Sequence, residues 1–238
     1  MESGHLWIYR SDLVEATARH LEGGEIVRVR GQRGRLLGSA FYSSKSQIAL
    51  RMLTWGESRP DRALLRLRLL AAARLRQDVA KDAVAYRLVH GEGDLLPALV
   101  VDKYGDYLVM QLLSQGTDRL KNLWVELLEE LYSPKAIVER SDVGVRQLEG
   151  LPERAEVVRG ELPVELTVEL NGIRFGADLL RGQKTGLFLD QRENYAAAMR
   201  YAHGRALDCF TFAGGFALHM ARRASHVTAL DISSAAVE

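Results

Sequence analysis

Residues 205–231 follow the pattern of a strand, a glycine turn, a helix and a second strand, and this pattern restricts the fold more than any other part of the chain. The apolar run "RALDCFTFA" leads to a pair of glycines, then to the helical segment "FALHMARRA" and the apolar run "HVTALDI". A β-α-β unit of this kind opens a parallel, doubly wound sheet. The predicted fold class for this part of the chain is therefore α/β.

The turn between the first strand and the helix is a candidate nucleotide-binding site. Glycines lack side chains, so a ligand can approach the free N–H groups at the start of the helix. Asp231 ends the second strand, at about the spacing from Gly214 expected for a carboxylate that accepts hydrogen bonds from the ribose hydroxyls. We expect Asp231 to hold the ribose of an adenosine-bearing cofactor. The alternative is that it caps a helix beginning near Ser233.

The glycine spacing also bears on which cofactor is bound. It is not the GxGxxG of a dinucleotide pyrophosphate site, which disfavours a dinucleotide-dependent oxidoreductase. No segment is long and apolar enough to predict a membrane span, and the N-terminus lacks the order of a signal peptide. The single cysteine, Cys209, agrees with a reducing compartment. We therefore expect a cytoplasmic protein.

Basic residues are concentrated at the front of the chain. Residues 1–80 hold 14 Lys and Arg against 8 Asp and Glu, a local charge of +6 in a chain whose net charge is +1. This asymmetry favours contact with a polyanion such as RNA, with a solvated surface as the plain alternative. We predict salt-sensitive RNA binding in this region, with Arg10, Lys45 and Arg51 as candidate contacts.

The front of the chain is predicted to fold as a small β-barrel followed by a helix. "GEIVRVRGQRGRLLGSAFY" alternates apolar and polar residues on both sides of a glycine turn, and "SQIALRMLTW" adds a strand. Trp7 and Phe41 are expected in the barrel core. The Ala/Leu/Arg-rich segment after Asp61 is predicted to be one helix with Asp61 as its N-cap. Its arginines lie on more than one face, which favours a solvated helix between domains.

The middle of the chain is predicted to be an α+β module. Strands alternate with Gly-rich turns in "AYRLVHGEGDLLPALVVDKYGDYLVMQLLS", a helix runs from Thr117 to about Tyr132, and "KAIVERSD" adds a strand. The pair Asn171-Gly172 predicts a two-residue hairpin turn. His90 is expected to be a turn residue. The predicted domains are residues 1–66, 67–165 and 166–238.

Six segments spread over essentially the whole chain carry a family resemblance. They are "GHLWIYRSDL", "SQIALRMLT", "HGEGDLLPALVVDKYGDYLV", "GQKTGLFLDQREN", "LDCFTFAGGFAL" and "TALDISSAAVE". Together they resemble the bacterial 23S rRNA cytosine-C5 methyltransferases that use S-adenosylmethionine. The resemblance implies an N-terminal PUA domain that binds RNA, a central α+β domain, and a Rossmann-like class I methyltransferase domain. It also implies S-adenosylmethionine as cofactor and 23S rRNA as partner.

The resemblance also implies a set of cofactor-binding residues. The segment matching "TGLFLDQR" would lie over the cofactor, the turn after the first strand would form the floor, Asp231 would take the ribose and Ile232 would pack on adenine. Asp190 as a helix cap, Arg192 as a surface residue and Phe188 as a core aromatic are the alternatives. The residues carried over are Phe188, Asp190, Arg192, Asp208, Phe210, Thr211, Gly214, Asp231 and Ile232.

Catalytic residues are expected beyond Glu238. Methyl transfer to C5 of cytosine needs a nucleophile at C6 and a base, which the family places on later strands. Cys209 is expected to pack in the core instead. A sheet of only two parallel strands leaves an edge unpaired, so we expect the chain to be truncated. We expect it to bind the cofactor weakly and to transfer no methyl group. The unpaired edge also favours a homodimer. The alternative is a non-catalytic RNA-binding protein with a vestigial nucleotide fold.

Overall fold

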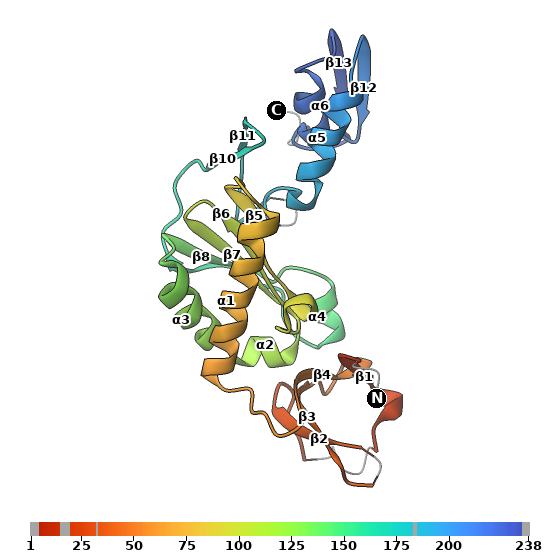
Figure 1. The fold of residues 1–238 in the computed structure, drawn as a ribbon, viewed down its shortest axis with the longest axis vertical. Coiled ribbons are helices and arrows are strands. Elements are labelled where there is room, and N and C mark those ends of the chain that lie inside the picture. The colour runs from red at the N-terminus through yellow and green to blue at the C-terminus, as the bar shows by residue number, and fades with distance from the viewer. Residues whose placement is uncertain (1–4, 15–19, 32, 183–184, 235–238) are drawn as a thin grey trace. The chain divides into compact units, whose positions relative to one another are not determined.

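The computed structural model divides into two compact units (Figure 1). One unit comprises residues 1–81 and 87–162, and the other comprises residues 82–86 and 163–238. The domain boundaries predicted from the sequence, at 66 and 165, stay predictions. The residues that the structure describes are 5–14, 20–31, 33–182 and 185–234.

The N-terminal strands form a four-stranded antiparallel sheet in the order β1-β4-β3-β2. Its core is a cluster that includes Ile8, Val29 and Leu50. Phe41 is buried, as predicted. Trp7, also predicted to lie in the core, is 41% exposed. Side chains alternate between the two faces of a strand, so Ile8 points inward and Trp7 outward. The strands are β1 (Trp7–Tyr9), β2 (Ile26–Arg30), β3 (Leu36–Tyr42) and β4 (Ile48–Trp55), with a 3-10 turn, η1 (Arg10–Asp12), after β1.

The predicted helix after Asp61 is present as α1 (Arg62–Val79). The Asp61 carboxylate accepts a hydrogen bond from the backbone N–H of Leu64 at 2.9 Å, which confirms the predicted N-cap. The helix is not solvated all round, because one stripe, Leu65, Leu69 and Ala72, is buried. Leucines four residues apart lie on one face, so α1 packs along this stripe while its arginines remain outside.

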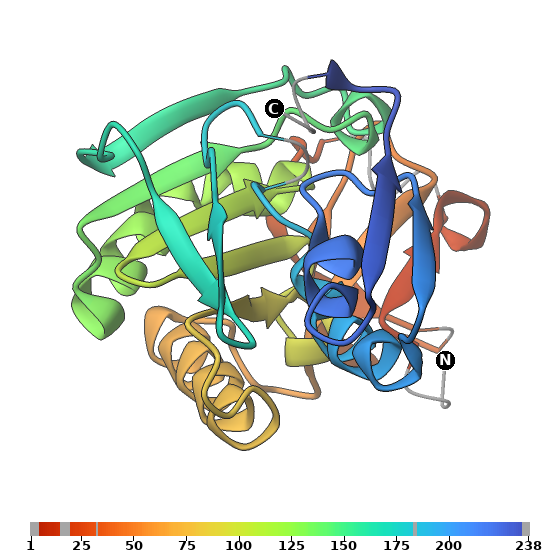
Figure 2. The same cartoon turned by 90° about the horizontal axis from the view of Figure 1, so that it is seen from above.

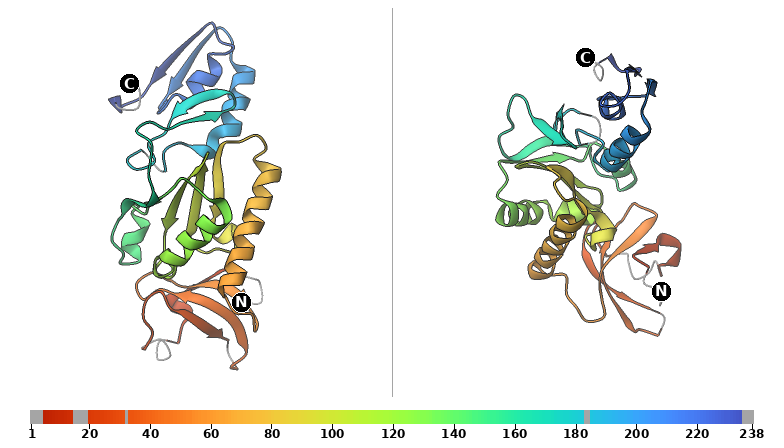
Figure 3. Two further views of the ribbon diagram at one scale, coloured as in Figure 1. Left: turned by 90° about the vertical axis from the view of Figure 1, so that its left-hand side faces the viewer. Right: turned by 45° about the horizontal axis from the view of Figure 1, so that its top comes forward.

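A mixed five-stranded sheet, in the order β5-β6-β7-β8-β9, follows α1. The Tyr132 hydroxyl donates to the Leu69 carbonyl at 3.0 Å, so α3 lies beside α1 (Figure 3). The helix predicted from Thr117 to Tyr132 is two helices that meet at Leu120. The strands are β5 (Ala85–His90), β6 (Leu99–Tyr104), β7 (Tyr107–Leu112), β8 (Ala136–Arg140) and β9 (Ala155–Gly160), and the helices are η3 (Gly91–Asp94), α2 (Gln115–Arg119), α3 (Lys121–Tyr132) and α4 (Val145–Leu148).

The second unit contains the predicted hairpin and the predicted β-α-β unit. Asn171 and Gly172 have φ values of 52° and 76°, so both turn residues are left-handed as a type I′ turn requires. Strands β12 and β13 pair in parallel, with α6 packed beside them (Figure 2). The elements are β10 (Thr167–Leu170), β11 (Ile173–Gly176), η4 (Leu189–Gln191), α5 (Arg192–Tyr201), β12 (Arg205–Cys209), α6 (Gly215–Met220) and β13 (His226–Leu230).

Candidate functional site

The turn between β12 and α6 is fixed by the buried carboxylate of Asp208. Its Oδ2 accepts hydrogen bonds from the Thr211 hydroxyl at 2.6 Å and from the Ala217 N–H at 3.0 Å. The first bond holds the turn and the second holds the opening of α6. Asp208 therefore ties the end of the strand to the start of the helix, and the Thr211 side chain is turned toward this carboxylate.

The backbone of this turn is left-handed at three positions. Phe210, Phe212 and Gly214 have φ values of 63°, 48° and 76°. Left-handed backbone is costly for residues with a Cβ, so the surrounding contacts must stabilise the two phenylalanines. The Thr211 N–H donates to the Leu230 carbonyl at 2.9 Å, which anchors the turn to the neighbouring strand.

Asp231 follows β13 and lies against the same turn. Its Oδ2 accepts the Phe212 N–H at 2.8 Å, and its Oδ1 accepts the Ser233 N–H at 2.9 Å. These two backbone bonds, that of Ser233 first, hold the pKa of the Asp231 carboxyl below its usual value. The Ser233 bond is of the type that the helix-cap alternative predicts. The Phe212 bond brings the carboxylate to the glycine turn, because the carboxyl ends of two parallel strands meet at one edge.

This edge fits an adenosine-bearing cofactor. An ionised carboxylate has about four acceptor positions, and the two backbone bonds leave room for ribose hydroxyl donors at Asp231. Ile232 is 100% exposed and Phe210 is 87% exposed, so apolar side chains in the turn and shortly after β13 are available for an aromatic base. The structure thus gathers Asp208, Phe210, Thr211, Gly214, Asp231 and Ile232 around one turn.

The segment that precedes α5 also reaches this turn. The Phe188 ring packs edge-on against the Phe212 ring, with centroids 5.1 Å apart and an interplanar angle of 81°. Asp190 is exposed in η4, and the Arg192 guanidinium donates to the Glu193 carboxylate at 3.0 Å. Phe188 is therefore placed beside the candidate site by a direct contact. Gln183 and Lys184, part of the motif that carries the resemblance, lie outside the described residues.

Two buried side chains behind the turn were missed by the sequence reasoning. A Cβ on Gly215 would overlap the ring of Tyr195, so this glycine serves helix packing between α5 and α6. His219 is fully buried and its ring lies 5.2 Å from that of Tyr195. Burial raises the pKa of Tyr195 to about 12, with Asp190 and Asp208 adding to the effect, and it lowers the pKa of His219. Only the apolar spacing of α5 and α6 in the sequence could have indicated these contacts.

Cys209 is exposed, which corrects the prediction that it packs in the core. Alternation along β12 explains this, since Asp208 is the buried residue and its neighbours point to the opposite face. Leu207, two residues away on that face, is 60% exposed. Among the described residues, the face of β12 that carries Leu207 and Cys209 is left exposed.

Two of the three arginine and lysine candidates for RNA contact are bonded within the protein. Arg10 donates to the backbone carbonyls of Ser43 and Ser46 at 2.6 Å and 2.9 Å. Arg51 is buried and pairs with two carboxylates, whereas Lys45 is exposed. The guanidinium groups of Arg10 and Arg51 therefore have a structural role that the sequence did not indicate.

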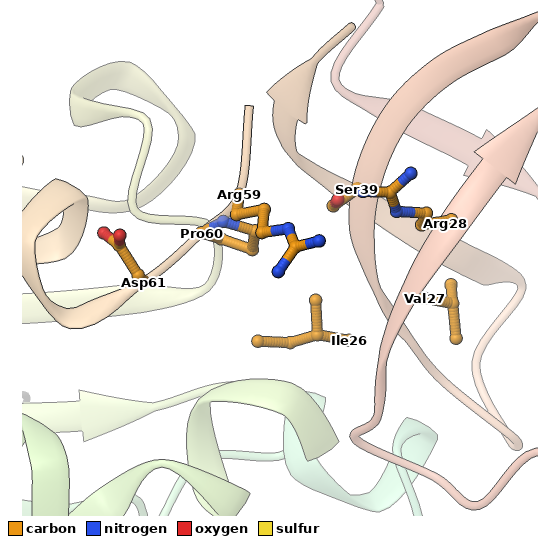
Figure 4. A pocket seen from close by; sticks show the side chains of 7 residues that line it. All are labelled: Ile26, Val27, Arg28, Ser39, Arg59, Pro60 and Asp61. Carbon is orange, nitrogen blue, oxygen red and sulfur yellow. The ribbon is translucent and has the colours of Figure 1, made fainter. Parts of the chain in front are cut away.

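A hollow of about 410 Å³ is lined by residues of β2 and β3 and by the segment before α1 (Figure 4). Arg28 on β2 and Arg59 in the segment before α1 both line it, and the Arg59 side chain extends toward Ile26. Arg28 has an exposed ion pair with Glu57 at 3.6 Å, while Arg59 makes no ion pair within the described residues. The other lining residues are Val27, Ser39, Pro60 and Asp61.

The described residues contain neither a membrane-spanning helix nor a cluster of metal ligands. No helix in them is long and apolar enough to cross a membrane. Nor do these residues bring together three His, Cys, Asp or Glu side chains that could hold a metal ion.

Comparison with protein families identifies most of the chain, across both compact units. The model of the S-adenosylmethionine-dependent methyltransferases matches residues 86–238, and that of the PUA-like domain matches residues 1–55. The chain belongs to the S-adenosylmethionine-dependent methyltransferase family. Its fold class, a PUA-like domain joined to a Rossmann-like methyltransferase fold, is the one predicted from the sequence.

Relatives of this methyltransferase chain are named for an RNA substrate. The ribosomal RNA large subunit methyltransferase I of Photobacterium profundum is 38% identical over 240 residues, covering 98% of this chain and 60% of the relative. That of Tolumonas auensis is 39% identical over 241 residues, with the same coverage. The chain thus spans about 60% of the length of these curated relatives.

Solved methyltransferase structures share the fold. A structure described as a SAM-dependent methyltransferase from Streptococcus mutans has a TM-score of 0.79 at 20% identity, covering 97% of this chain and 60% of that one. SMU.776, described as a methyltransferase complexed with SAH, has a TM-score of 0.82 at 20% identity, covering 98% and 60%. At this identity the likeness concerns the fold alone.

Proposed function

We propose that the residues around the glycine turn hold S-adenosylmethionine in an enzyme that transfers its methyl group to large-subunit ribosomal RNA, at C5 of a cytosine, in the cytoplasm. Family membership supports the cofactor, and the names of the relatives support the RNA. The choice of C5 follows from the motif resemblance. The observation that carries the proposal is the Asp231 carboxylate held against the glycine turn at the shared edge of β12 and β13.

The proposed roles of the site residues follow from their geometry. S-adenosylmethionine, when bound, supplies a methyl group on a positively charged sulfur. Asp231 accepts the ribose hydroxyls, and Ile232 and Phe210 offer apolar surface to the adenine. Asp208 holds the turn in shape through Thr211 and Ala217. Phe188, Asp190 and Arg192 are proposed to close the site from η4, its preceding residue and the first residue of α5.

The RNA contact is proposed to lie on the N-terminal sheet. A guanidinium group binds phosphate in a bidentate manner and stacks on bases, and Arg28 and Arg59 present two such groups around one hollow that has apolar walls from Ile26 and Pro60 (Figure 4). Lys45 adds an exposed cation. Arg10 and Arg51 remain in the proposal as residues that shape this domain, because their guanidinium groups bond to the protein. A homodimer stays a prediction.

The substitution Asp231→Ala tests the cofactor site. It removes the acceptor for the ribose, so the affinity for S-adenosylhomocysteine measured by calorimetry should fall roughly tenfold or more. In a protein of the relatives' full length, transfer of a labelled methyl group to 23S rRNA should fall with it, and the label in the wild-type reaction should be in C5-methylcytosine.

A matched control separates the site from general effects of the substitution. Asp78→Ala removes an exposed carboxylate from α1, far along the sequence from the turn, and should leave the affinity unchanged. Equal affinity of Asp231→Ala and wild type, with both folded by circular dichroism, would contradict the proposed ribose contact. A label in another base would contradict the proposed C5 position but not the proposed cofactor site.

A further inference from the structure

The side-chain amide of Asn171 joins two elements that are distant in the sequence. Its Nδ2 lies 2.9 Å from the carbonyl oxygen of Arg192, at the start of α5, and 3.2 Å from Nε2 of His219, on α6. An amide nitrogen carries two hydrogens, so both contacts can be hydrogen bonds at once. Asn171 thus contributes one donor to α5 and one to α6.

The tautomer of His219 fixes the direction of these bonds. Its Nδ1 lies 2.7 Å from the carbonyl oxygen of Gly215, which can only accept, so Nδ1 carries the hydrogen. Burial lowers the pKa of the His219 ring, which favours the neutral form and leaves Nε2 as an acceptor. Both partners of the Asn171 amide are then acceptors, and only the Nδ2 end satisfies them.

The backbone of the hairpin turn is held as well. The Arg222 guanidinium donates to the carbonyl oxygens of Asn171 and Gly172, at 2.9 Å and 2.6 Å. Arg222 follows α6, so these two bonds hold the hairpin turn at the end of that helix. The position of Asn171 therefore does not depend on its own side-chain bonds, because Arg222 clamps the turn through the backbone.

The result is a continuous chain of hydrogen bonds from Arg192 through Asn171 and His219 to Gly215. Arg192 directly follows η4, which carries Asp190, and Gly215 opens α6 directly after the glycine turn. These are the two walls of the proposed cofactor site. We propose that Asn171 and His219 are positioning residues, which set the distance between these walls and so determine the affinity for the cofactor. This inference rests on the proposed cofactor site.

The substitution Asn171→Gly isolates the side-chain bonds. Glycine is favoured in a left-handed turn and keeps both carbonyls for Arg222, so the melting temperature should change little. Affinity for S-adenosylhomocysteine should fall about tenfold, since two donors are lost. Val168→Ala in the same hairpin is the control: it removes buried methyl groups and should lower the melting temperature with affinity unchanged.

A double substitution tests whether the two residues act as one unit. His219→Phe retains an aromatic ring beside Phe175 and Tyr195 but has no hydrogen-bonding nitrogen. It should lower affinity by a similar factor, and combining it with Asn171→Gly should lower affinity no further. Fully additive losses, or normal affinity in a folded Asn171→Gly variant, would overturn the inference.

Hydrogen exchange provides a readout that does not need the cofactor. In Asn171→Gly, amide exchange should become faster at the start of α5 and at the glycine turn, with β10 unchanged. If the wild-type protein does not bind S-adenosylhomocysteine, the proposed cofactor site is rejected. The exchange measurement still tests whether Asn171 positions the start of α5 and the glycine turn. Unchanged exchange at both walls would reject that role whatever the affinity.

Discussion

Tyr195 shows how one side chain joins the helices of the second unit. Its ring contacts Phe216 edge-on, with centroids 4.8 Å apart, and lies over the backbone of Gly215. The phenol is buried, and its pKa is raised from 10.0 to about 12, chiefly by that burial. Neutral tyrosine is thus part of the packed state, and ionising it costs stability.

The effect of pH on stability follows from this shift. Because the folded-state pKa is above the unfolded one, the free energy of unfolding is unaffected by Tyr195 below about pH 10 and decreases between pH 10 and 12. Tyr195→Phe should therefore lose less stability than wild type over that interval. Urea unfolding at pH 8 and at pH 11 measures how much stability each protein loses. Other groups that titrate in this interval affect both proteins equally, so they cancel when the two losses are compared. Parallel losses in the two proteins would contradict the prediction.

Some residues could be assigned from the sequence and others could not. The positions of Asp231, after a strand, and of Asn171, in a hairpin turn, were predicted because strand ends and two-residue turns leave local signals. Trp7 and Cys209 were misplaced because both sit on strands whose inward face is chosen by a neighbour, Ile8 or Asp208. Which face of a short strand is covered depends on contacts made with distant parts of the chain, and three to five residues of sequence do not reveal it.

Helices and strands were also predicted correctly where local sequence signals mark them and missed where distant contacts determine them. Helix α1 and the β10-β11 hairpin were predicted because a cap and a turn pair mark their ends. Strand β9 was missed because its residues are mostly exposed and its pairing with β8 is its main stabilisation. The break at Leu120 was missed as well. The short helix α2 begins with a capping box formed by Ser114 and Thr117 and ends at Arg119, and α3 begins at Lys121.

The cap of α1 can be tested by Asp61→Ala. Removing the acceptor for the Leu64 N–H should lower the free energy of unfolding by about 1 kcal/mol. Asp78→Ala, in the last turn of the same helix, removes a negative charge from the negative end of the helix dipole and should be neutral or slightly stabilising. Urea denaturation compares the two. Equal effects would show that the Asp61 side chain does not stabilise α1 as a cap.

Within the first unit, the N-terminal sheet and the five-stranded sheet are joined by a buried charge cluster. Arg51 on β4 pairs with Glu92 at 3.1 Å and with Glu149 at 3.5 Å, and its guanidinium lies 5.7 Å from the centre of the Trp7 ring. The Trp7 Nε1–H donates to Glu92 at 2.8 Å. The two sheets are thus connected by ion pairs as well as by the covalent chain.

The contribution of this cluster is open to a direct test. Arg51→Ala leaves Glu149 buried without its cation, so the free energy of unfolding should fall by about 3 kcal/mol. Arg28→Ala breaks an exposed ion pair with Glu57 and should change it by less than about 1 kcal/mol. Thermal or urea unfolding of the whole chain measures both. A loss at Arg51 as small as that at Arg28 would show that the buried pair is not stabilising.

The cluster around Arg51 has a consequence for how a nucleic acid could be recognised. Its ion pairs link β4, in the N-terminal sheet, to η3 and to the residue after α4, so if RNA binds as proposed we expect the hollow formed by Arg28 and Arg59 to change its orientation little on binding. Any adjustment on docking would then have to come from the nucleic acid, which favours pliable single-stranded or looped segments over a stiff duplex.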